Sequence, residues 1–335
     1  MRTLIIAEAG VNHNGDLDMA FRLCDAAKES GADIIKFQMW KTENIITHNV
    51  EQADYQKKNA GKEESQFDML KRLELSFQSF KRIKEYCDSV GILFASTVDD
   101  KESLDFLVTL GVPFIKVGSG EIGNIPFLKY IGSKHLPVIL STGMSTLADI
   151  DISLHALQEG GTDNITILHC TTSYPCPYED VNLNAMKTLK NAFHLSVGYS
   201  DHTLGTEVPV AAVAMGAVVI EKHFTLDKGL KGPDHAASME PGEFKKMVQA
   251  IRNIECAMGT AKKAPTDAER KISSVVIKRI VAKSVIEKGQ PFTEDNLTVK
   301  RNDSGIPAKY WDLIIGSKAN NNYLPDQAIS LGAVK

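Results

Sequence analysis

The chain has 335 residues, of which 43% are hydrophobic and 24% are charged, and its formal net charge at pH 7 is −4. This length allows one large domain and one small domain, and the composition argues against a disordered chain. The slightly acidic balance argues against general binding to nucleic acid, and no apolar stretch approaches the roughly 20 residues that a membrane-spanning helix needs.

Short apolar, β-branched segments recur along the first 260 residues, and an amphipathic pattern follows each of them. Their nearly continuous apolar character is typical of parallel strands that are covered on both faces. The expected strands are Thr3–Ala9, Asp33–Gln38, Ile92–Thr97, Phe114–Gly118, Pro137–Thr142, Ile165–Cys170, Leu195–Tyr199 and Ala217–Lys222. The helical patterns include Leu17–Ser30, Phe77–Ser89, Glu102–Leu110, Leu147–Leu157 and Gly242–Met258.

This alternation of strands and helices predicts a (β/α)8 barrel over residues 1–260. A doubly wound open sheet is the alternative, but no glycine-rich dinucleotide loop follows the first strand. The polar insertion Lys41–Glu74 follows the second strand. We expect it to form a loop or short helices over the mouth of the barrel, where such insertions commonly carry function.

The character of the sequence changes after Gly259. Residues 261–275 are polar and charged, which suits a linker. Short strand-like runs follow, among them Ser273–Val276 and Ile280–Val285, and turn sequences separate them. We therefore expect a small β-rich domain over residues 276–335, which is marginal by itself and should dock onto another surface.

The five cysteines and the N-terminus indicate the cellular compartment. The cysteines have neither a metal-finger spacing nor a CxxC spacing, so reduced thiols are the expectation. The first residues lead directly into an apolar strand, without the pattern of a signal peptide. These features together predict a cytoplasmic protein.

Two successive predicted strands end near a histidine, His202 and His223, and both rings can point at one place above the barrel. A lone histidine is more often a core residue with satisfied hydrogen bonds. Here Asp201 and Glu221 flank the pair and could fix the tautomers. Two histidine ligands leave coordination positions open, which suits a catalytic metal, and Mn²⁺, Zn²⁺ and Mg²⁺ all remain open.

Two lysines, Lys36 and Lys116, lie on the second and fourth predicted strands, close to Gln38 and Ser119. Ammonium groups together with hydroxyl groups are suited to hold a phosphate and a carboxylate. The alternative is that both lysines extend from the strand ends as ordinary solvated charges. Other polar residues at the strand ends are Glu8, Thr97, Ser141, Thr172, Tyr174 and Ser200.

Taken together, these residues resemble the sialic acid synthases, a group that includes the legionaminic and pseudaminic acid synthases. The motifs, in chain order, are Glu8-Ala-Gly-Val-Asn-His-Asn-Gly15, Lys36-Phe-Gln38, Lys116-Val-Gly-Ser-Gly-Glu121, Leu140-Ser-Thr-Gly-Met144, His169-Cys-Thr-Thr-Ser-Tyr-Pro175, Gly198-Tyr-Ser-Asp-His202, Glu221-Lys-His-Phe-Thr225 and Gly232-Pro-Asp234. The tail, with Ile286-Glu-Lys-Gly289 and Lys300-Arg301, is similar to the antifreeze-like (SAF) domain found at the C-terminus of this family's members.

The resemblance implies that phosphoenolpyruvate condenses with the open-chain aldehyde of an N-acetylmannosamine-type sugar, giving a nine-carbon α-keto acid and phosphate. It implies a divalent cation, Mn²⁺ or Mg²⁺, on His202 and His223, and Glu8 or Glu221 as the base. The implied phosphoenolpyruvate site is Lys36, Thr97, Lys116, Ser119, Ser141, Thr172 and Ser200. The implied sugar site is Glu8, Gln38, Tyr174, Asp234 and Arg301. Arg301 would come from the tail of a second subunit, in a domain-swapped homodimer.

Three departures from the family pattern leave the acceptor sugar open. Val98-Asp99 stands where many relatives carry Pro-Phe, and Asn302 replaces the usual proline after Arg301. Thr172 stands where some N-acetylneuraminate synthases carry asparagine and where legionaminic acid synthases often carry threonine. It therefore favours a 2,4-diacetamido-trideoxy sugar over N-acetylmannosamine.

Two other functions remain as alternatives. A metal-dependent aldolase on the same barrel would use free pyruvate and would need no phosphate site. A non-catalytic carbohydrate-binding protein would use the tail and would have no reason to bring lysines and histidines together.

Overall fold

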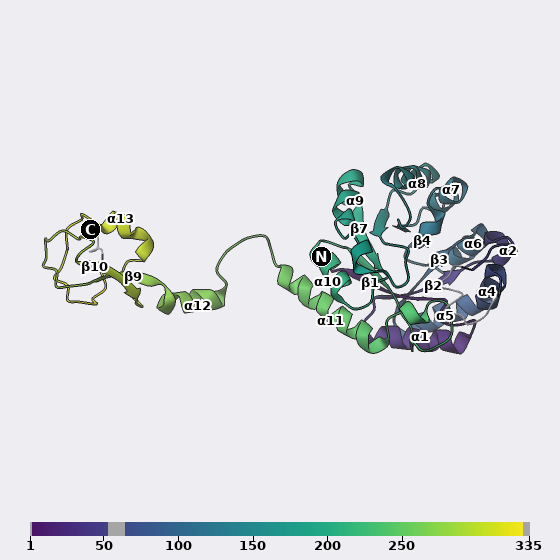
Figure 1. Cartoon of the computed structure of the whole chain (residues 1–335), viewed down its shortest axis with the longest axis horizontal. Coiled ribbons are helices and arrows are strands. Elements are labelled where there is room, and N and C mark those ends of the chain that lie inside the picture. The colour runs from purple at the N-terminus through teal and green to yellow at the C-terminus, as the bar shows by residue number, and fades with distance from the viewer. Residues whose placement is uncertain (1, 53–63, 331–335) are drawn as a thin grey trace. The chain divides into compact units, whose positions relative to one another are not determined.

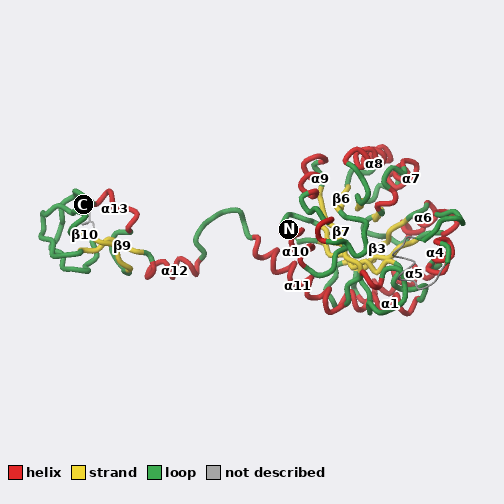
Figure 2. The backbone as a smooth tube through the Cα atoms, in the orientation of Figure 1, coloured by secondary structure: helices red, strands yellow, loops and turns green. Residues whose placement is uncertain are grey.

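The computed structural model of the protein describes residues 2–52 and 64–330. In this part of the chain, eight parallel strands follow one another around a closed barrel, so the predicted (β/α)8 fold is confirmed (Figures 1 and 2). The strands are β1 (Leu4–Gly10), β2 (Ile34–Met39), β3 (Leu93–Val98), β4 (Ile115–Val117), β5 (Val138–Ser141), β6 (Ile165–His169), β7 (Ser196–Asp201) and β8 (Val219–His223).

Helices surround the strands on the outside of the barrel, as Figure 2 shows in red and yellow. They are α1 (Leu17–Glu29), α5 (Phe77–Val90), α6 (Lys101–Thr109), α7 (Ile125–Gly132), α8 (Leu147–Gly160), α9 (Ala185–Phe193), α10 (Glu207–Ala214) and α11 (Pro241–Met258). Local side-chain caps begin several of them. The Asp16 carboxylate accepts hydrogen bonds at the start of α1, and Thr146 forms a capping box with Asp149 at the start of α8.

The insertion after β2 contains the short helices α2 (Thr42–Ile45) and α4 (Gln66–Leu73), as predicted, and residues 53–63 between them lie outside the described residues. Met69 and Leu73 of α4 pack with Val11 and Trp40 in a separate small apolar cluster. Because Val11 directly follows β1, this packing holds α4 close to the C-terminal ends of the first strands.

The inward-facing residues of the barrel change character along its axis. An apolar cluster fills the interior near the N-terminal ends of the strands: Ile6, Ile34, Ala95, Phe114, Ile139, Leu168 and Val219. Side chains alternate between the faces of a strand, so residues two positions further along point the same way. On six strands that next position is polar and buried: Glu8, Lys36, Thr97, Lys116, Ser141 and Glu221. The barrel therefore has an apolar floor beneath a polar mouth.

Residues Thr260–Lys335 form a compact unit that is distinct from the unit Met1–Gly259. Its strands β9 (Lys278–Ala282) and β10 (Leu297–Arg301) pair in antiparallel fashion, and the helix α13 (Trp311–Ile314) follows. A small apolar core includes Ile280, Phe292 and Leu297. The tail therefore has a core of its own.

One predicted element of the tail is wrong. Ser273–Val276 is not a strand but the last part of the helix α12 (Asp267–Val276), which occupies most of the segment expected to be a linker. Thr266 and Glu269 form a capping box at its start. The β-branched run at 275–277 favoured a strand, but a cap that satisfies the first backbone N–H groups favours a helix over the preceding residues.

None of the five cysteines forms a disulfide; Cys24, Cys87, Cys170 and Cys176 are buried, whereas Cys256 is exposed. The Sγ atoms of Cys24 and Cys87 lie 3.5 Å apart. Among the described residues, no helix combines the length and the apolar character that crossing a bilayer requires.

Candidate active site

Four charged side chains meet in the mouth of the barrel and form a buried charge cluster. The Lys36 Nζ lies 2.5 Å from the Glu8 carboxylate and 3.7 Å from the Glu221 carboxylate. The Lys116 Nζ also lies 3.7 Å from Glu221, so Glu221 stands between the two lysines. Both lysines are only 2% exposed, which excludes the alternative that they are solvated surface charges.

Hydroxyl groups complete the charge cluster. The Lys36 Nζ donates to the Thr97 Oγ1 at 2.7 Å, and the Lys116 Nζ donates to the Ser141 Oγ at 2.8 Å. The Ser200 hydroxyl donates to Glu221 at 2.9 Å. Each lysine thus has an anionic partner and a hydroxyl partner. The lysines could donate the same hydrogen bonds to the oxygens of a phosphate or carboxylate ligand.

The two carboxyl groups of the cluster have very different proton affinities. Burial raises the pKa of Glu8 to about 7, although Lys36 opposes the rise. Burial would also raise the pKa of Glu221, but Lys116, Lys36 and the Ser200 hydroxyl together lower it to about 2. Near pH 7, Glu221 is therefore a fixed negative charge, whereas Glu8 can gain or lose a proton.

Ser119 is the first residue of the short 3-10 helix η1 (Ser119–Glu121), and it is closely packed against Gly143. The Gly143 N–H donates to the Ser119 Oγ at 2.9 Å. A Cβ atom at Gly143 would lie 2.3 Å from the Thr172 Oγ1 and 2.9 Å from the Ser119 Oγ. Only glycine fits there, and the predicted residues Ser119 and Thr172 are brought together across this position.

The two histidines at the ends of β7 and β8 face each other, with ring centroids 5.5 Å apart. The His202 Nδ1 lies 2.6 Å from the Thr171 carbonyl oxygen and must donate to it, so the Nε2 carries the lone pair. Burial lowers the pKa of His202, and burial together with His202 lowers the pKa of His223 to about 3. Both rings are neutral near pH 7.

Neutral imidazoles are the form that binds a metal, and the His223 Nδ1 is buried without a hydrogen-bond partner. The two rings therefore fit a divalent cation. No group of three or more histidine, cysteine or acidic side chains with metal-binding geometry occurs among the described residues, so the protein would leave several coordination positions open.

The expectation for Asp201 is wrong. Its carboxylate does not fix a histidine tautomer but forms a buried ion pair with Lys222, 2.5 Å from its Nζ, and accepts from the backbone and hydroxyl of Thr203. The backbone carbonyl of Thr171 orients His202 instead. Glu221 faces the lysines, as described above. Alternation along the strand explains the difference, because Asp201 precedes His202 and points to the other face.

The predicted sugar ligands gather beside the histidines. The Gln38 Nε2 donates to the Glu8 carboxylate at 2.9 Å, and the Asp234 carboxylate lies 4.0 Å from the His223 Nδ1. The Tyr174 ring lies 4.3 Å from the His202 ring, measured between centroids. A Cβ atom at Gly10 would lie within 3.7 Å of Gln38, Glu8 and Asp234, so these three side chains converge on one point.

Two small cavities contain these residues. The first, about 210 Å³, is lined by all the predicted barrel residues except Asp234: Glu8, Lys36, Gln38, Thr97, Lys116, Ser119, Ser141, Thr172, Tyr174, Ser200, His202, Glu221 and His223. Asp234 lines the second, also about 210 Å³, which shares Gln38, Tyr174 and His223 with the first. We call them the charged cavity and the distal cavity.

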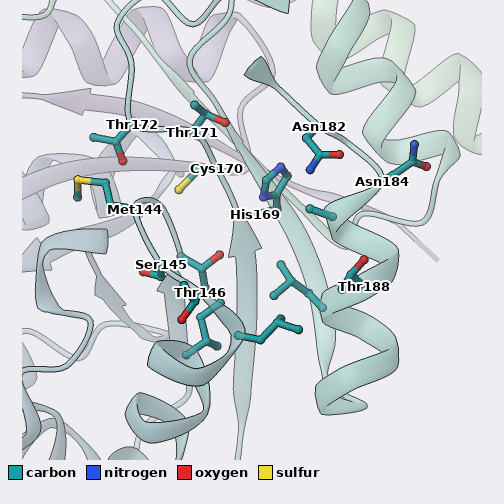
Figure 3. Close-up of a pocket in the computed structure, with 15 residues that line it drawn as sticks. Met144, Ser145, Thr146, His169, Cys170, Thr171, Thr172, Asn182, Asn184 and Thr188 are labelled. Atoms are coloured by element: carbon teal, nitrogen blue, oxygen red, sulfur yellow. The ribbon is translucent and has the colours of Figure 1, made fainter. Parts of the chain in front are cut away.

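A larger cavity of about 720 Å³ lies next to the charged cavity (Figure 3). It shares Met144, Cys170 and Thr172 with the charged cavity, and its other polar lining residues include His169 and Asn182. Its described lining residues include no lysine, no arginine and no carboxylate. The charged residues are therefore concentrated in the smaller cavity and not in this larger one.

Comparison with known proteins identifies the family of the chain and of its C-terminal domain. Residues 23–263 match the NeuB family, and residues 278–335 match the SAF domain. The chain belongs to the NeuB family. This confirms the resemblance that the motifs indicated, and the SAF match covers the small unit that contains β9 and β10.

Relatives within the NeuB family match nearly the whole chain. The chain is 48% identical to an N,N'-diacetyllegionaminic acid synthase of Campylobacter jejuni over 330 residues, 98% of this chain and 99% of that one. It is 38% identical to the N-acetylneuraminate-9-phosphate synthase of Homo sapiens over 94% of this chain and 88% of that one. A solved N-acetylneuraminic acid synthetase of Leptospira borgpetersenii, in complex with citrate, has a TM-score of 0.71 at 34% identity, over 81% of this chain and 90% of that one.

Arg301 is the predicted site residue of this NeuB family member that belongs to the SAF domain and not to the barrel. It is the last residue of β10 in the SAF domain, and it is exposed. Its role in a sugar site, and the domain-swapped dimer that this role requires, stay predictions.

Sequence reasoning missed some residues of the site. Asp99 lines the charged cavity, and burial raises its pKa to about 7. Its position two residues after Thr97 was the signal, because the two share a face. Met69, Leu70 and Leu73 of α4 line the distal cavity, and nothing in the polar insertion pointed to them as site residues.

Proposed function

We propose that the protein is a synthase that joins phosphoenolpyruvate to an N-acetylated amino sugar and releases phosphate. The observation that carries the proposal is the charged cavity, in which two buried lysines and two neutral histidines lie within one small volume. Membership in the NeuB family and identity to named synthases along the whole chain support it. A pyruvate aldolase would leave Lys116 and its hydroxyl partner without a phosphate to bind.

Phosphoenolpyruvate carries a phosphate and a carboxylate, and the cavity offers a lysine for each. Without ligand, Glu8 and Glu221 both lie beside Lys36, and Glu221 lies beside Lys116. Because burial raises the pKa of Glu8 to about 7, Glu8 can become neutral when an anionic ligand binds beside Lys36. The hydroxyls of Thr97, Ser141 and Ser200, with Ser119 and Thr172, would complete the hydrogen bonds of the ligand oxygens.

His202 and His223 would hold the divalent cation, Mn²⁺ or Mg²⁺. When bound, such a cation supplies Lewis-acid polarisation of the acceptor aldehyde. The two rings keep this chemistry next to Gln38, Tyr174 and Asp234, which would orient the sugar. The Thr171 carbonyl fixes the direction of the His202 ring, so the geometry is set before substrates arrive.

The proposed condensation forms one C–C bond and breaks one C–O bond. C3 of phosphoenolpyruvate forms a bond to C1 of the aldehyde, whose oxygen becomes an alkoxide. Water adds to C2 and gives one proton to Glu8, the carboxyl group whose pKa is near the working pH, and Glu8 passes this proton to the alkoxide. The bond between C2 and the bridging oxygen of the phosphate then breaks, the new C2 hydroxyl becomes the ketone, and its proton leaves with the inorganic phosphate. Lys36 and Lys116 stabilise the charge on the departing phosphate.

The acceptor that we propose is 2,4-diacetamido-2,4,6-trideoxymannose, the precursor of N,N'-diacetyllegionaminic acid. Thr172 and the 48% identity to a synthase of that product support it. We propose further that the protein acts in the cytoplasm as a homodimer in which Arg301 of one subunit contacts the sugar in the barrel of the other. The family resemblance supports this assembly.

The test follows phosphate release from phosphoenolpyruvate with Mn²⁺ or with a chelator, offering N-acetylmannosamine and the trideoxy sugar in parallel. We expect metal-dependent release, faster with the trideoxy sugar. Phosphoenolpyruvate labelled with ¹⁸O at the bridging oxygen should transfer the label to phosphate, because the C–O bond breaks. Folded protein that releases no phosphate with either sugar, or label retained in the keto acid, would contradict the proposal.

A further inference from the structure

The distal cavity is lined by two kinds of residues. Gln38, Tyr174, His223 and Asp234 are polar, and they are the residues next to the proposed reacting centre. Apart from Pro233, the other lining residues are the apolar Val11, Met69, Leu70 and Leu73, which we call the apolar wall. None of the described residues that line this cavity is a lysine or an arginine.

The two cavities adjoin each other, because Gln38, Tyr174 and His223 line both. An acceptor whose aldehyde lies at the histidines would therefore direct its opposite end toward the distal cavity. In a hexose-derived acceptor the aldehyde is C1, so carbons C4 to C6 and their substituents face the apolar wall.

The apolar wall is a fixed surface. Met69 is 1% exposed and Leu73 is fully buried, because both pack with Trp40 in the small cluster under α4. The end of α4 is fastened as well, since the Glu74 carboxylate accepts hydrogen bonds from the backbone N–H and the hydroxyl of Thr42. Because α4 is held in this way, its apolar side chains stay directed at the cavity and its polar side chains do not replace them. Leu70 is partly buried and has the freest side chain of the four.

Apolar substituents suit this surface better than hydroxyl groups do. A hydroxyl that is buried against leucine and methionine loses its hydrogen bonds to water and gains none, whereas a methyl group gains burial. Compared with N-acetylmannosamine, the trideoxy sugar carries a methyl in place of the C6 hydroxymethyl and an acetamido in place of the C4 hydroxyl. Both changes put a methyl group at the end that faces the wall.

We propose that the apolar wall is the specificity determinant for the acceptor, selecting sugars that carry an acetamido group at C4 and a methyl group at C6 and rejecting those with a hydroxyl or a phosphate there. This inference rests on the proposed function, because it assumes that the sugar aldehyde reacts at the histidines. The described lining residues of this cavity include no lysine or arginine, which extends the inference to phosphorylated acceptors, since a phosphate beside Asp234 would be desolvated without a cation from this lining.

The experiment compares kcat/KM for three acceptors at saturating phosphoenolpyruvate: the trideoxy sugar, N-acetylmannosamine and N-acetylmannosamine 6-phosphate. The variant Leu70→Asn makes the wall polar at its most accessible residue. Val11→Thr adds one hydroxyl without changing the shape of the side chain, and it tests the same wall if Leu70→Asn fails to fold. The matched control is Leu93→Asn, at an exposed leucine at the N-terminal end of β3.

The wild-type protein should prefer the trideoxy sugar and should not use the 6-phosphate. Leu70→Asn should lower the preference, taken as the ratio of the two kcat/KM values, by about 10-fold, the effect that one apolar group typically has in a specificity pocket. Val11→Thr should lower it in the same direction. The KM for phosphoenolpyruvate should stay unchanged in both variants, and Leu93→Asn should resemble the wild type.

Several results would overturn the inference. Folded wall variants with an unchanged preference, or with equal losses for both sugars, would show that the wall does not discriminate, while the synthase reaction would stand. A wild-type protein that prefers the 6-phosphate would also overturn the inference and leave the synthase reaction standing. A wild-type protein that releases phosphate with none of the acceptors would instead overturn the proposed function, and the inference with it.

Discussion

Two carboxyl groups in one small cavity differ in the pH at which they ionise, and this difference separates their roles. Glu221 is held ionised between two lysines, whereas the pKa of Glu8 is raised to about 7 by burial. A group that is ionised down to pH 2 is a weak base, but one with a pKa near 7 can accept and return a proton during turnover.

The first prediction concerns the pH dependence of kcat/KM for phosphoenolpyruvate. If the Glu8 carboxylate is the base, protonation below its pKa removes activity, so kcat/KM should fall about tenfold per pH unit below about 7 and level off above it. His223 adds no limb there, because burial and the neighbouring His202 lower its pKa to about 3.

Glu8→Gln provides the control, since it keeps the shape of the side chain while the ligand's own ionisation is unchanged. Activity should drop strongly and the limb near pH 7 should disappear. A limb of the same position and slope in Glu8→Gln would assign the titration to phosphoenolpyruvate or to another group.

The second prediction concerns Lys116. Lys116→Met removes one charge-assisted contact to phosphoenolpyruvate, and such contacts contribute roughly 1.5–3 kcal/mol, so its dissociation constant should rise by about 10- to 100-fold. Isothermal titration without acceptor sugar measures this directly. Lys245→Met, at an exposed position on α11, is the matched control and should bind normally. Equal affinity in both variants would remove Lys116 from the binding site.

Most of the site could be predicted residue by residue, but the partners of those residues could not. Strand periodicity places Lys36, Lys116 and Glu221 on the inner face, and the barrel brings them together. The sequence offers no comparable signal that the Thr171 carbonyl orients His202, because any residue has a carbonyl. Asp201 was misplaced for a related reason: its neighbour in sequence points to the opposite face.

At the scale of elements, strands were predicted better than the segments that connect them. A parallel barrel strand buries both faces, so its sequence is apolar almost throughout and its bounds are visible. The helix Asp267–Val276 has largely exposed side chains, and its β-branched end indicated a strand. The apolar residues of α4 could not be assigned to the site, because only tertiary packing against Val11 and Trp40 turns them toward the cavity.

The third prediction concerns the ion pair that joins β7 and β8. Asp201 and Lys222 are almost completely buried, so Asp201→Asn leaves an unpaired buried ammonium group. We expect the free energy of unfolding to fall by about 3–5 kcal/mol, measured by urea denaturation. Adding Lys222→Met should recover much of that loss, because it removes the stranded charge.

The control for this prediction is an exposed pair. Lys129 and Glu159 contact each other across α7 and α8 with more than half of each side chain in solvent. Glu159→Gln should therefore change stability by less than about 1 kcal/mol. Similar decreases in the free energy of unfolding for Asp201→Asn and Glu159→Gln would mean that burial of the β7–β8 ion pair does not increase its effect on stability.

At the scale of the whole molecule, the chain combines an acidic barrel unit that holds the charged cavity with a small SAF unit that holds Arg301. The family resemblance predicts that Arg301 serves the barrel of a second copy. Two inactive variants can distinguish this arrangement from one in which each tail serves its own barrel. Lys116→Ala disables the barrel and leaves the tail intact, whereas Arg301→Ala does the reverse.

The fourth prediction is that mixing these variants restores activity. In a swapped dimer of one Lys116→Ala and one Arg301→Ala subunit, one of the two sites combines the intact barrel with the intact tail, so the mixed dimer should have about half of the wild-type activity. Co-expression with two affinity tags, followed by phosphate-release assays on the purified doubly tagged dimers, measures it. If each tail serves its own barrel, every site in the mixed dimer carries one defect, and the mixture stays as inactive as its parents.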